Sequence, residues 1–268
     1  MSVIKTYKKN GYHVAKNLLP KILVNQVLYE INELINKQLV SLGIDVGQTL
    51  GDSLKLLFEK DIGRYKKVLS SLWRSLELTR LLQNQIIIDY VKENFGFENI
   101  LLPGGQVIHI QSKSLIIPGG YFGFDPHQDY QSVRGSLDGL IVWIPFNDID
   151  KNNYPLELIP GSHLNGLYPL KTARNEQAVI DPASYSEKDF LSIILGKGDV
   201  VFMSYFTLHR SSRKGLEENV RIACSTRFDN CNEKSFIKRG YPTAYIRDVD
   251  RNVNNIFPSR DDIIKIFS

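Results

Sequence analysis

Three polar side chains in this sequence have the types and the spacing of a metal-ligand set. His127 and Asp129 lie two positions apart, so in an extended segment both side chains point to the same face of the chain. A second histidine, His209, follows the apolar run 200–203 far downstream. Two imidazoles and one carboxylate on one face, with the other coordination positions open, are the ligands of non-haem Fe(II) oxygenases. The sequence therefore predicts a catalytic iron site formed by His127, Asp129 and His209.

Two other classes of protein could carry the same three residues. One is a jelly-roll protein that binds a sugar or another metabolite without catalysis, but a pure binder has no need of open metal positions. The other is a zinc hydrolase, but the sequence places no glutamate near the His-x-Asp pair to act as general base. The pair by itself also suits two polar side chains that hydrogen-bond to backbone at a strand end. Its combination with His209 favours the oxygenase, and the non-catalytic binder is kept as the alternative.

An arginine follows His209 in a position suited to bind a cosubstrate. Arg221 lies at the start of the apolar run 220–228. If 2-oxoglutarate supplies the electrons, it chelates iron through its 2-oxo group and C1 carboxylate, and its far carboxylate then needs a cation. Arginine meets a carboxylate with two parallel hydrogen bonds, and an arginine among apolar neighbours requires a buried partner. We therefore predict that Arg221 anchors 2-oxoglutarate, the alternative being a surface arginine on an edge strand.

Composition indicates one globular protein with a substantial core. Of the 268 residues, 43% are hydrophobic and 23% are charged, which is the profile of an ordinary globular chain. The net charge of +4 is mild and dispersed, so the sequence predicts no nucleic-acid partner. Cys224 and Cys231 form neither a zinc pattern nor a disulfide framework. We expect a small-molecule substrate, and the sequence does not indicate an oligomeric state.

The N-terminal segment and the apolar runs predict the cellular compartment. Residues 1–9 contain no apolar stretch followed by a cleavage site. No apolar run approaches the length of a membrane span. We therefore expect a cytoplasmic protein without membrane insertion.

The order of the expected elements indicates an α+β fold. Helical periodicity fills 20–42 and, in several pieces, 53–94, with breaks at Gly63 and 83–85 and an end at Gly96. After residue 105 short β-rich runs separated by turn residues take over, which favours a jelly roll buttressed by helices. Further expected elements are a strand at 12–14, a helix at 186–194 within the excursion 165–197, and a helix at 259–266. The expected strands of the core are 106–111, 121–124, 140–146, 156–159, 200–203 and 220–228.

Several motifs, in this order, resemble the phytanoyl-CoA dioxygenase family. They are His127-Gln128-Asp129, Val142-Trp143-Ile144-Pro145, Leu158-Ile159-Pro160-Gly161-Ser162-His163, Gly198-Asp199-Val200-Val201, His209 and Arg221. The resemblance covers about residues 105–230 and implies a double-stranded β-helix (jelly-roll, cupin-like) core. Because no repeat or low-complexity linker marks a boundary, we expect a single domain over 1–268, with 1–100 as a mainly helical buttress, 105–230 as the jelly-roll core and 231–268 as a C-terminal extension. The resemblance also implies a dioxygenase that uses Fe(II), 2-oxoglutarate and O2 to hydroxylate a small molecule, with release of succinate and CO2.

The resemblance also assigns roles to individual residues. Ser211 and Trp143 match positions that line the cosubstrate site in the family. Gln111 begins a Gln-Ser-Lys stretch similar to that of ectoine hydroxylases, in which the glutamine contacts substrate. Those enzymes carry a further lysine for 2-oxoglutarate where this chain has Ile117, so we expect His109, on the same alternating face as Gln111, to take over part of that polar contact with the cosubstrate.

The residues that follow the metal pair predict the kind of substrate. Tyr130, Gln131 and Arg134 should lie on the pocket rim and, with Gln111, bind the substrate, although a solvated loop is an alternative for Arg134. These donors and acceptors favour a small polar metabolite, such as a sugar derivative or an amino-acid-like molecule, over a fatty acyl-CoA. A halogenase of this family would lack the carboxylate ligand, so the presence of Asp129 favours hydroxylation.

Overall fold

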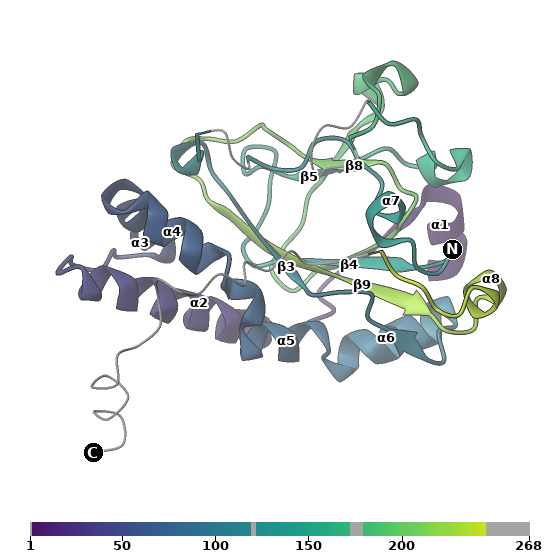
Figure 1. Cartoon of the computed structure of the whole chain (residues 1–268), viewed down its shortest axis with the longest axis horizontal. Coiled ribbons are helices and arrows are strands. Elements are labelled where there is room, and N and C mark those ends of the chain that lie inside the picture. The colour runs from purple at the N-terminus through teal and green to yellow at the C-terminus, as the bar shows by residue number, and fades with distance from the viewer. Residues whose placement is uncertain (1, 119–121, 172–178, 245–268) are drawn as a thin grey trace.

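The computed structural model describes residues 2–118, 122–171 and 179–244, and it combines a helical layer with two antiparallel sheets (Figure 1). The larger sheet has the strand order β1-β7-β4-β9-β2, with β3 also paired to β9, and the smaller sheet has the order β6-β5-β8. Figure 1 shows α2, α5 and α6 beneath the larger sheet, with β5 and β8 on its opposite side. The strands are β1 Tyr12–Ala15, β2 Ile100–Leu101, β3 Val107–Gln111, β4 Leu140–Pro145, β5 Leu156–Leu158, β6 Leu191–Ile193, β7 Val200–Ser204, β8 His209–Ser211 and β9 Arg221–Asn230.

The helical layer forms because short amphipathic segments start and stop at well-defined residues. In α2, five residues at three- and four-residue spacing, from Val24 to Leu39, are buried. Thr49 and Asp52 form a capping box at the start of α3, and Gly96 ends α6 in the left-handed conformation at φ 75°. The helices are α1 Val3–Asn10, α2 Lys21–Ser41, α3 Leu50–Lys60, α4 Ile62–Leu69, α5 Leu76–Leu82, α6 Gln85–Phe95, α7 Tyr130–Val133 and α8 Lys234–Lys238.

Strand β4 divides the interior into two cores. Every residue of β4 is buried, and successive side chains point to opposite faces. Leu140, Val142 and Ile144 belong to the core beneath the helices, whereas Ile141 and Trp143 belong to the core between the two sheets. The inner face of the larger sheet, which looks toward the smaller sheet, is therefore the face of Ile141 and Trp143.

The structure confirms most of the expected elements. The helix at 20–42, the helical pieces between 53 and 94, and the strand at 12–14 are present, as are five of the six expected core strands. The break that we expected at Gly63 lies at Asp61, whose side chain caps α4. The expected C-terminal helix at 259–266 lies outside the described residues.

Two of the expected elements are wrong. The described part of 121–124 is not a strand. The expected helix at 186–194 is a 3-10 turn, Glu187–Asp189, followed by strand β6, because Leu191–Ile193 pair with the edge of β5. Helix α1 was not expected, since none of its residues is buried and its sequence is rich in lysine. Tertiary pairing outweighs local helical preference at β6.

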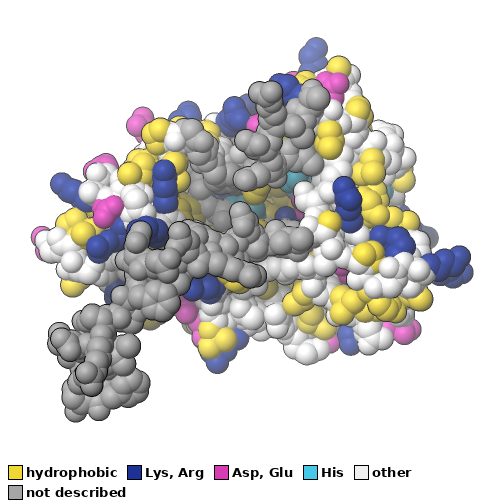
Figure 2. All heavy atoms as spheres, in the orientation of Figure 1, with side chains coloured by type: hydrophobic (Ala, Val, Ile, Leu, Met, Phe, Trp, Pro, Cys, Tyr) yellow, Lys and Arg dark blue, Asp and Glu magenta, His cyan; other side chains and the backbone are white. Residues whose placement is uncertain are grey.

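Among the described residues, no helix combines the length and the apolar character needed to cross a bilayer. On the face shown in Figure 2, Lys and Arg side chains are dispersed over the surface among Asp and Glu.

An aromatic contact attaches the helical layer to the larger sheet, and its removal tests the packing. The ring of Phe202 on β7 is fully buried and lies 5.1 Å from the ring of Tyr90 and 5.4 Å from that of Phe95, both on α6. We predict that Phe202→Ala lowers the free energy of unfolding by about 3–5 kcal/mol, because it opens a cavity at this contact. Urea denaturation measures the change. Tyr29→Ala, at an exposed ring, is the control and should change the stability little, and an equal loss in both variants would contradict the prediction.

Candidate active site

The three predicted ligands converge at the edge of the smaller sheet. His127 lies just before α7, Asp129 immediately precedes that helix, and His209 is the first residue of β8. The Nε2 atoms of His127 and His209 lie 3.4 Å and 3.9 Å from Asp129 Oδ1. The three ligand atoms all lie within 4.8 Å of one another, as binding to a single ion requires. The donor set fits iron of the facial two-histidine, one-carboxylate type.

The main chain brings the two histidines together. The backbone N–H of His127 donates to the carbonyl of His209 at 3.0 Å, and the N–H of His209 donates to the carbonyl of His127 at 3.1 Å. This antiparallel bridge places the two rings 4.2 Å apart, centroid to centroid. Segments far apart in the sequence are thereby fixed side by side by backbone bonds.

Hydrogen bonds also fix which nitrogen each histidine presents. The Nδ1 atom of His127 lies 2.7 Å from the carbonyl oxygen of Asp125, and that of His209 lies 2.9 Å from the carbonyl oxygen of Thr207. A carbonyl only accepts, so each Nδ1 carries a proton and donates it, and in the neutral form of each ring Nε2 is the nitrogen with a lone pair. Such bonds orient metal-binding imidazoles and set their tautomer.

Charge in the site suits a divalent cation. Burial raises the pKa of the Asp129 carboxyl, but Arg227 and the two histidines outweigh burial and hold it well below its usual range. Burial, aided by His127, lowers the pKa of His209 to about 4. At neutral pH the site therefore offers an ionised carboxylate and, at His209, a neutral imidazole, which are the protonation states that a metal requires.

A cavity adjoins the three ligands on the inner face of the larger sheet. It is lined by both histidines of the set and by three of the four residues predicted to contact the cosubstrate, His109, Trp143 and Ser211. His109 is buried, and its Nε2 lies 2.9 Å from Ser225 Oγ. Burial and the charges of Arg221 and Arg227 lower the pKa of His109 well below its usual value, so the ring is neutral.

Arg221, the predicted anchor of the cosubstrate, is buried next to this cavity. Its side chain is 1% exposed, and its Nη1 donates to the carbonyl of Tyr154 at 2.7 Å. Its Nη2 lies 3.3 Å from Ser211 Oγ, and the guanidinium carbon is 5.9 Å from the centroid of the Trp143 ring. The structure thus brings Arg221, Ser211 and Trp143 into one group, in which the positive charge of the Arg221 guanidinium is buried.

The residues predicted to bind the substrate are held by protein contacts. Gln111 Nε2 donates to the carbonyl of Ser212 at 2.8 Å, and the Tyr130 ring stacks on Phe206 at 4.5 Å between centroids. Gln131 Nε2 donates to the carbonyl of Tyr168 at 3.1 Å. Arg134 is exposed and ends α7 in the left-handed conformation at φ 54°. In the described part of the chain these four residues do not line the cavity beside the ligands, so their contact with substrate stays a prediction.

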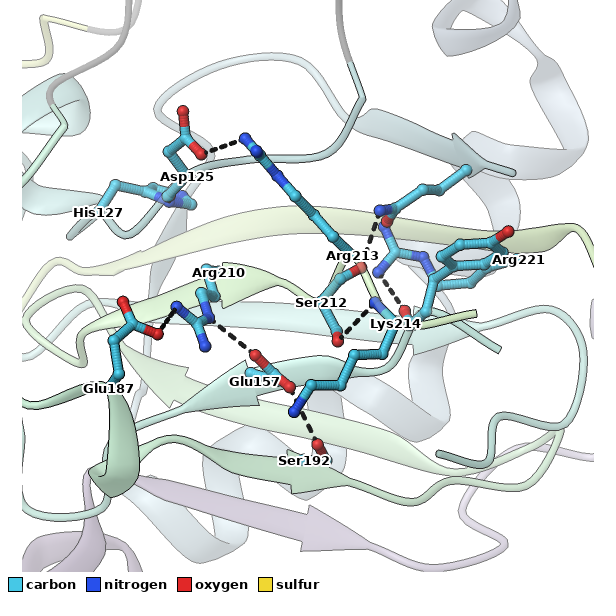
Figure 3. Close-up of polar contacts among 12 residues, drawn as sticks. Asp125, His127, Glu157, Glu187, Ser192, Arg210, Ser212, Arg213, Lys214 and Arg221 are labelled. Carbon is cyan, nitrogen blue, oxygen red and sulfur yellow. Dashed lines mark hydrogen bonds and ion pairs between the residues drawn. The ribbon is translucent and has the colours of Figure 1, made fainter. Parts of the chain in front are cut away.

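An open cleft of about 530 Å³ lies outside this cavity and shares Phe124, Arg210 and Ser211 with it. Ion pairs cross the cleft. Figure 3 shows Arg213 reaching Asp125, at 2.7 Å, and Arg210 held between Glu157 and Glu187, at 2.7 and 2.6 Å. Charged side chains of both signs therefore line the space next to the candidate site.

Two residues of the site were not predicted from the sequence. Gln128 is fully buried between the two ligands of the His-x-Asp pair, and its amide bonds to the carbonyls of Gly166 and Phe206 and to the N–H of Tyr168. Arg227 pairs with Asp129 through contacts of 2.8 Å. Strand alternation could have indicated Arg227, because it lies an even number of residues after Arg221 and so on the same face of β9.

Comparisons with known proteins agree on one family. The family model described as Phytanoyl-CoA dioxygenase (PhyH) matches residues 7–215. The peroxisomal phytanoyl-CoA dioxygenase of Bos taurus is 27% identical over 239 residues, covering 85% of this chain and 68% of the relative. That of Homo sapiens is 28% identical over 234 residues, covering 84% of this chain and 66% of the relative. The chain spans about two thirds of the length of these relatives.

Solved structures show the same fold at low sequence identity. The apo form of the non-haem monooxygenase ThoJ matches with a TM-score of 0.59 and 18% identity, covering 85% of this chain and 77% of that one. The epimerase SnoN in complex with Fe3+, alpha ketoglutarate and nogalamycin RO matches with a TM-score of 0.57 and 16% identity, covering 85% and 82%. EctD from S. alaskensis with 2-oxoglutarate and 5-hydroxyectoine matches with a TM-score of 0.54 and 13% identity, covering 93% and 80%.

The convergence of the three ligands makes a direct prediction. Asp129→Ala and His209→Ala should each weaken Fe(II) binding by about tenfold or more, because each removes one of three ligand atoms. Anaerobic calorimetric titration of Fe(II), or of Co(II) as a stable substitute, measures the affinity. His163→Ala is the control, since His163 contacts the carbonyl of Lys8 and lies outside the ligand group. Wild-type affinity in both ligand variants would reject this site.

Proposed function

The chain belongs to the phytanoyl-CoA dioxygenase family, and on this premise we propose that it hydroxylates a small polar metabolite as an Fe(II)- and 2-oxoglutarate-dependent dioxygenase. The family and its cofactors set the enzyme class, and the His127–Asp129–His209 group is the observation that carries the proposal for this chain. When bound, iron and 2-oxoglutarate supply the oxidising chemistry that turns a C–H bond of the substrate into C–OH, with release of succinate and CO2.

The residues predicted to hold the cosubstrate lie around the cavity beside the ligand group. Arg221 is our candidate for the far carboxylate of 2-oxoglutarate, because a buried guanidinium beside the metal ligands is well suited to a dianion. Ser211 is held next to Arg221 by a hydrogen bond, and Trp143 and His109 form walls of the same cavity. These four residues would position the cosubstrate and exclude water from it.

The arrangement of the sheets supports the finer fold assignment. The larger sheet turns one face to the helices and the other to β5, β6 and β8, and the apolar core between the sheets includes Trp143, Leu158 and Met203. Two facing antiparallel sheets are the architecture of a jelly roll, and this supports a double-stranded β-helix. We include this fold in the proposal, together with a single domain over 1–268 in which the helices up to residue 100 support the core.

The competing functions explain fewer observations. A non-catalytic binding jelly roll gives no reason for two histidines that both direct Nε2 toward one carboxylate oxygen. A halogenase would need a coordination position that Asp129 fills. Hydroxylation therefore accounts best for the site. A cytoplasmic location stays a prediction.

The surroundings of the site support a polar substrate. The cavity combines the apolar side chains of Ile141 and Leu156 with the polar ones of Ser225 and Arg227. Outside it, the cleft carries charged groups of both signs, including Asp125 and Arg213. A long hydrocarbon chain lying across these groups would remove them from water without offering hydrogen bonds, which is costly. A sugar derivative or an amino-acid-like metabolite would offer hydrogen bonds in place of those that the charged groups make to water.

The role of Arg221 can be measured separately from metal binding. Arg221→Ala should weaken 2-oxoglutarate binding by about 2–5 kcal/mol, because it removes a buried charged partner of the far carboxylate. Titration of 2-oxoglutarate at constant saturating metal measures the dissociation constant, with circular dichroism as a check on folding. Arg213→Ala, at an exposed arginine of the cleft, is the control. An unchanged dissociation constant in folded Arg221→Ala would move the anchor elsewhere.

The substrate class is tested by stimulated turnover. We expect polar metabolites, among them sugar derivatives and amino-acid-like molecules, to increase the release of succinate at saturating 2-oxoglutarate and Fe(II). Long-chain acyl-CoA thioesters should not, because the chain would cover charged groups that it cannot pair. Succinate is quantified by mass spectrometry for each candidate. Strong stimulation by an acyl-CoA with none from polar compounds would overturn the assignment.

A further inference from the structure

A second arginine of β9, Arg227, holds the carboxylate ligand from the side away from the histidines. Its Nε and Nη2 atoms both lie 2.8 Å from Asp129 Oδ2. We propose that Arg227 is a positioning residue of the metal centre, which fixes Asp129 so that Oδ1 alone is presented to the ion. The inference rests on the proposed function, because it takes His127, Asp129 and His209 as the ligands.

The two oxygens of Asp129 have separate partners. Oδ1 is the atom that lies 3.4 Å and 3.9 Å from the Nε2 atoms of His127 and His209, whereas Oδ2 receives both contacts from Arg227. A carboxylate without such a partner can bind an ion through both oxygens or rotate away from it. With Oδ2 occupied by two N–H groups, binding through one oxygen is favoured. This leaves a further coordination position open for cosubstrate or O2, as the chemistry of facial-triad iron requires.

The guanidinium of Arg227 is itself held in place. Arg227 pairs in register with Ile141 of β4, and its side chain is 11% exposed. Its Nη1 donates to Ser225 Oγ at 3.0 Å, and that hydroxyl lies 2.9 Å from Nε2 of buried His109. All three side chains belong to the cavity wall. A continuous set of hydrogen bonds therefore runs from His109 through Ser225 and Arg227 to the metal ligand Asp129.

The positive charge of Arg227 has its own effect on metal affinity, which a test must hold constant. The charge lowers the affinity because it repels the metal ion, whereas the contacts with Asp129 raise the affinity because they fix the carboxylate. Replacing Arg227 by a neutral residue changes both effects in opposite directions. Arg227→Lys separates them, because it keeps the charge and loses the planar pair of donors that meets Oδ2.

The decisive experiment is anaerobic Co(II) titration of the wild-type protein and Arg227→Lys. We expect the affinity of the variant to fall about tenfold, the effect typical of losing a partner that orients a ligand. The visible absorption of bound Co(II) should also change, because Asp129 is free to bind through both oxygens. Arg80→Lys is the control: it alters another close arginine–carboxylate pair, with Glu77 on α5, which lies outside the ligand group and the cavity beside it, and it should leave the Co(II) affinity unchanged.

The outcomes separate this inference from the proposed function. An affinity for Co(II) within twofold of wild type in folded Arg227→Lys overturns it, and so does an equal loss in Arg80→Lys, which would indicate a general loss of stability. If Arg227→Lys does not fold, Ser225→Ala carries the test, since it frees one nitrogen of the guanidinium and should weaken Co(II) binding in the same direction. No loss in Ser225→Ala then overturns the inference. A wild-type protein that binds no stoichiometric Co(II) rejects the proposed function and this inference together.

Discussion

The backbone bridge between His127 and His209 is the constraint on which the site depends. Its two N–H···O bonds join the segment before α7 to the first residue of β8, and this pairing brings the ligand residues together. Once the two residues pair, the alternation of side chains places Asp129 on the same side as His127, and the carbonyls of Asp125 and Thr207 orient the rings. The larger sheet and the helices behind it support the site from outside, because they fix the ends of these segments.

The core strands could be predicted from the sequence because they are short β-rich runs separated by turn residues. In β4 every residue is buried and the strand is a continuous apolar run. In β9 all but one residue is buried, and Ile222, Cys224 and Phe228 form its apolar face toward the helices. The helices of the first hundred residues have clear caps, such as the box of Thr49 and Asp52. Strand β6 could not be recognised in this way. Its three residues follow a serine that resembles a helix start, and they become a strand only through pairing with β5.

The candidate site was predictable where residue type and spacing carry the chemistry. The His-x-Asp spacing together with a second histidine downstream marks His127, Asp129 and His209, and its place beside an apolar run marks Arg221. The rim was harder to predict, because α7 begins at Tyr130 and a helix rotates successive side chains around its axis. The directions of Tyr130, Gln131 and Arg134 depend on that start, which the sequence does not mark. The alternation of side chains along β9 could have indicated Arg227, but no sequence motif marks this residue.

Gln128 ties the loop 166–168 directly to the metal pair. One amide group bonds to the carbonyls of Gly166 and Phe206 and accepts from the N–H of Tyr168, while its two sequence neighbours supply ligand atoms. Protein engineering that exchanges loops to change substrate preference would therefore disturb the candidate iron ligands if it altered the length of the chain at 166–168. The same amide makes the spacing of this loop a constraint on how far relatives of the chain can diverge.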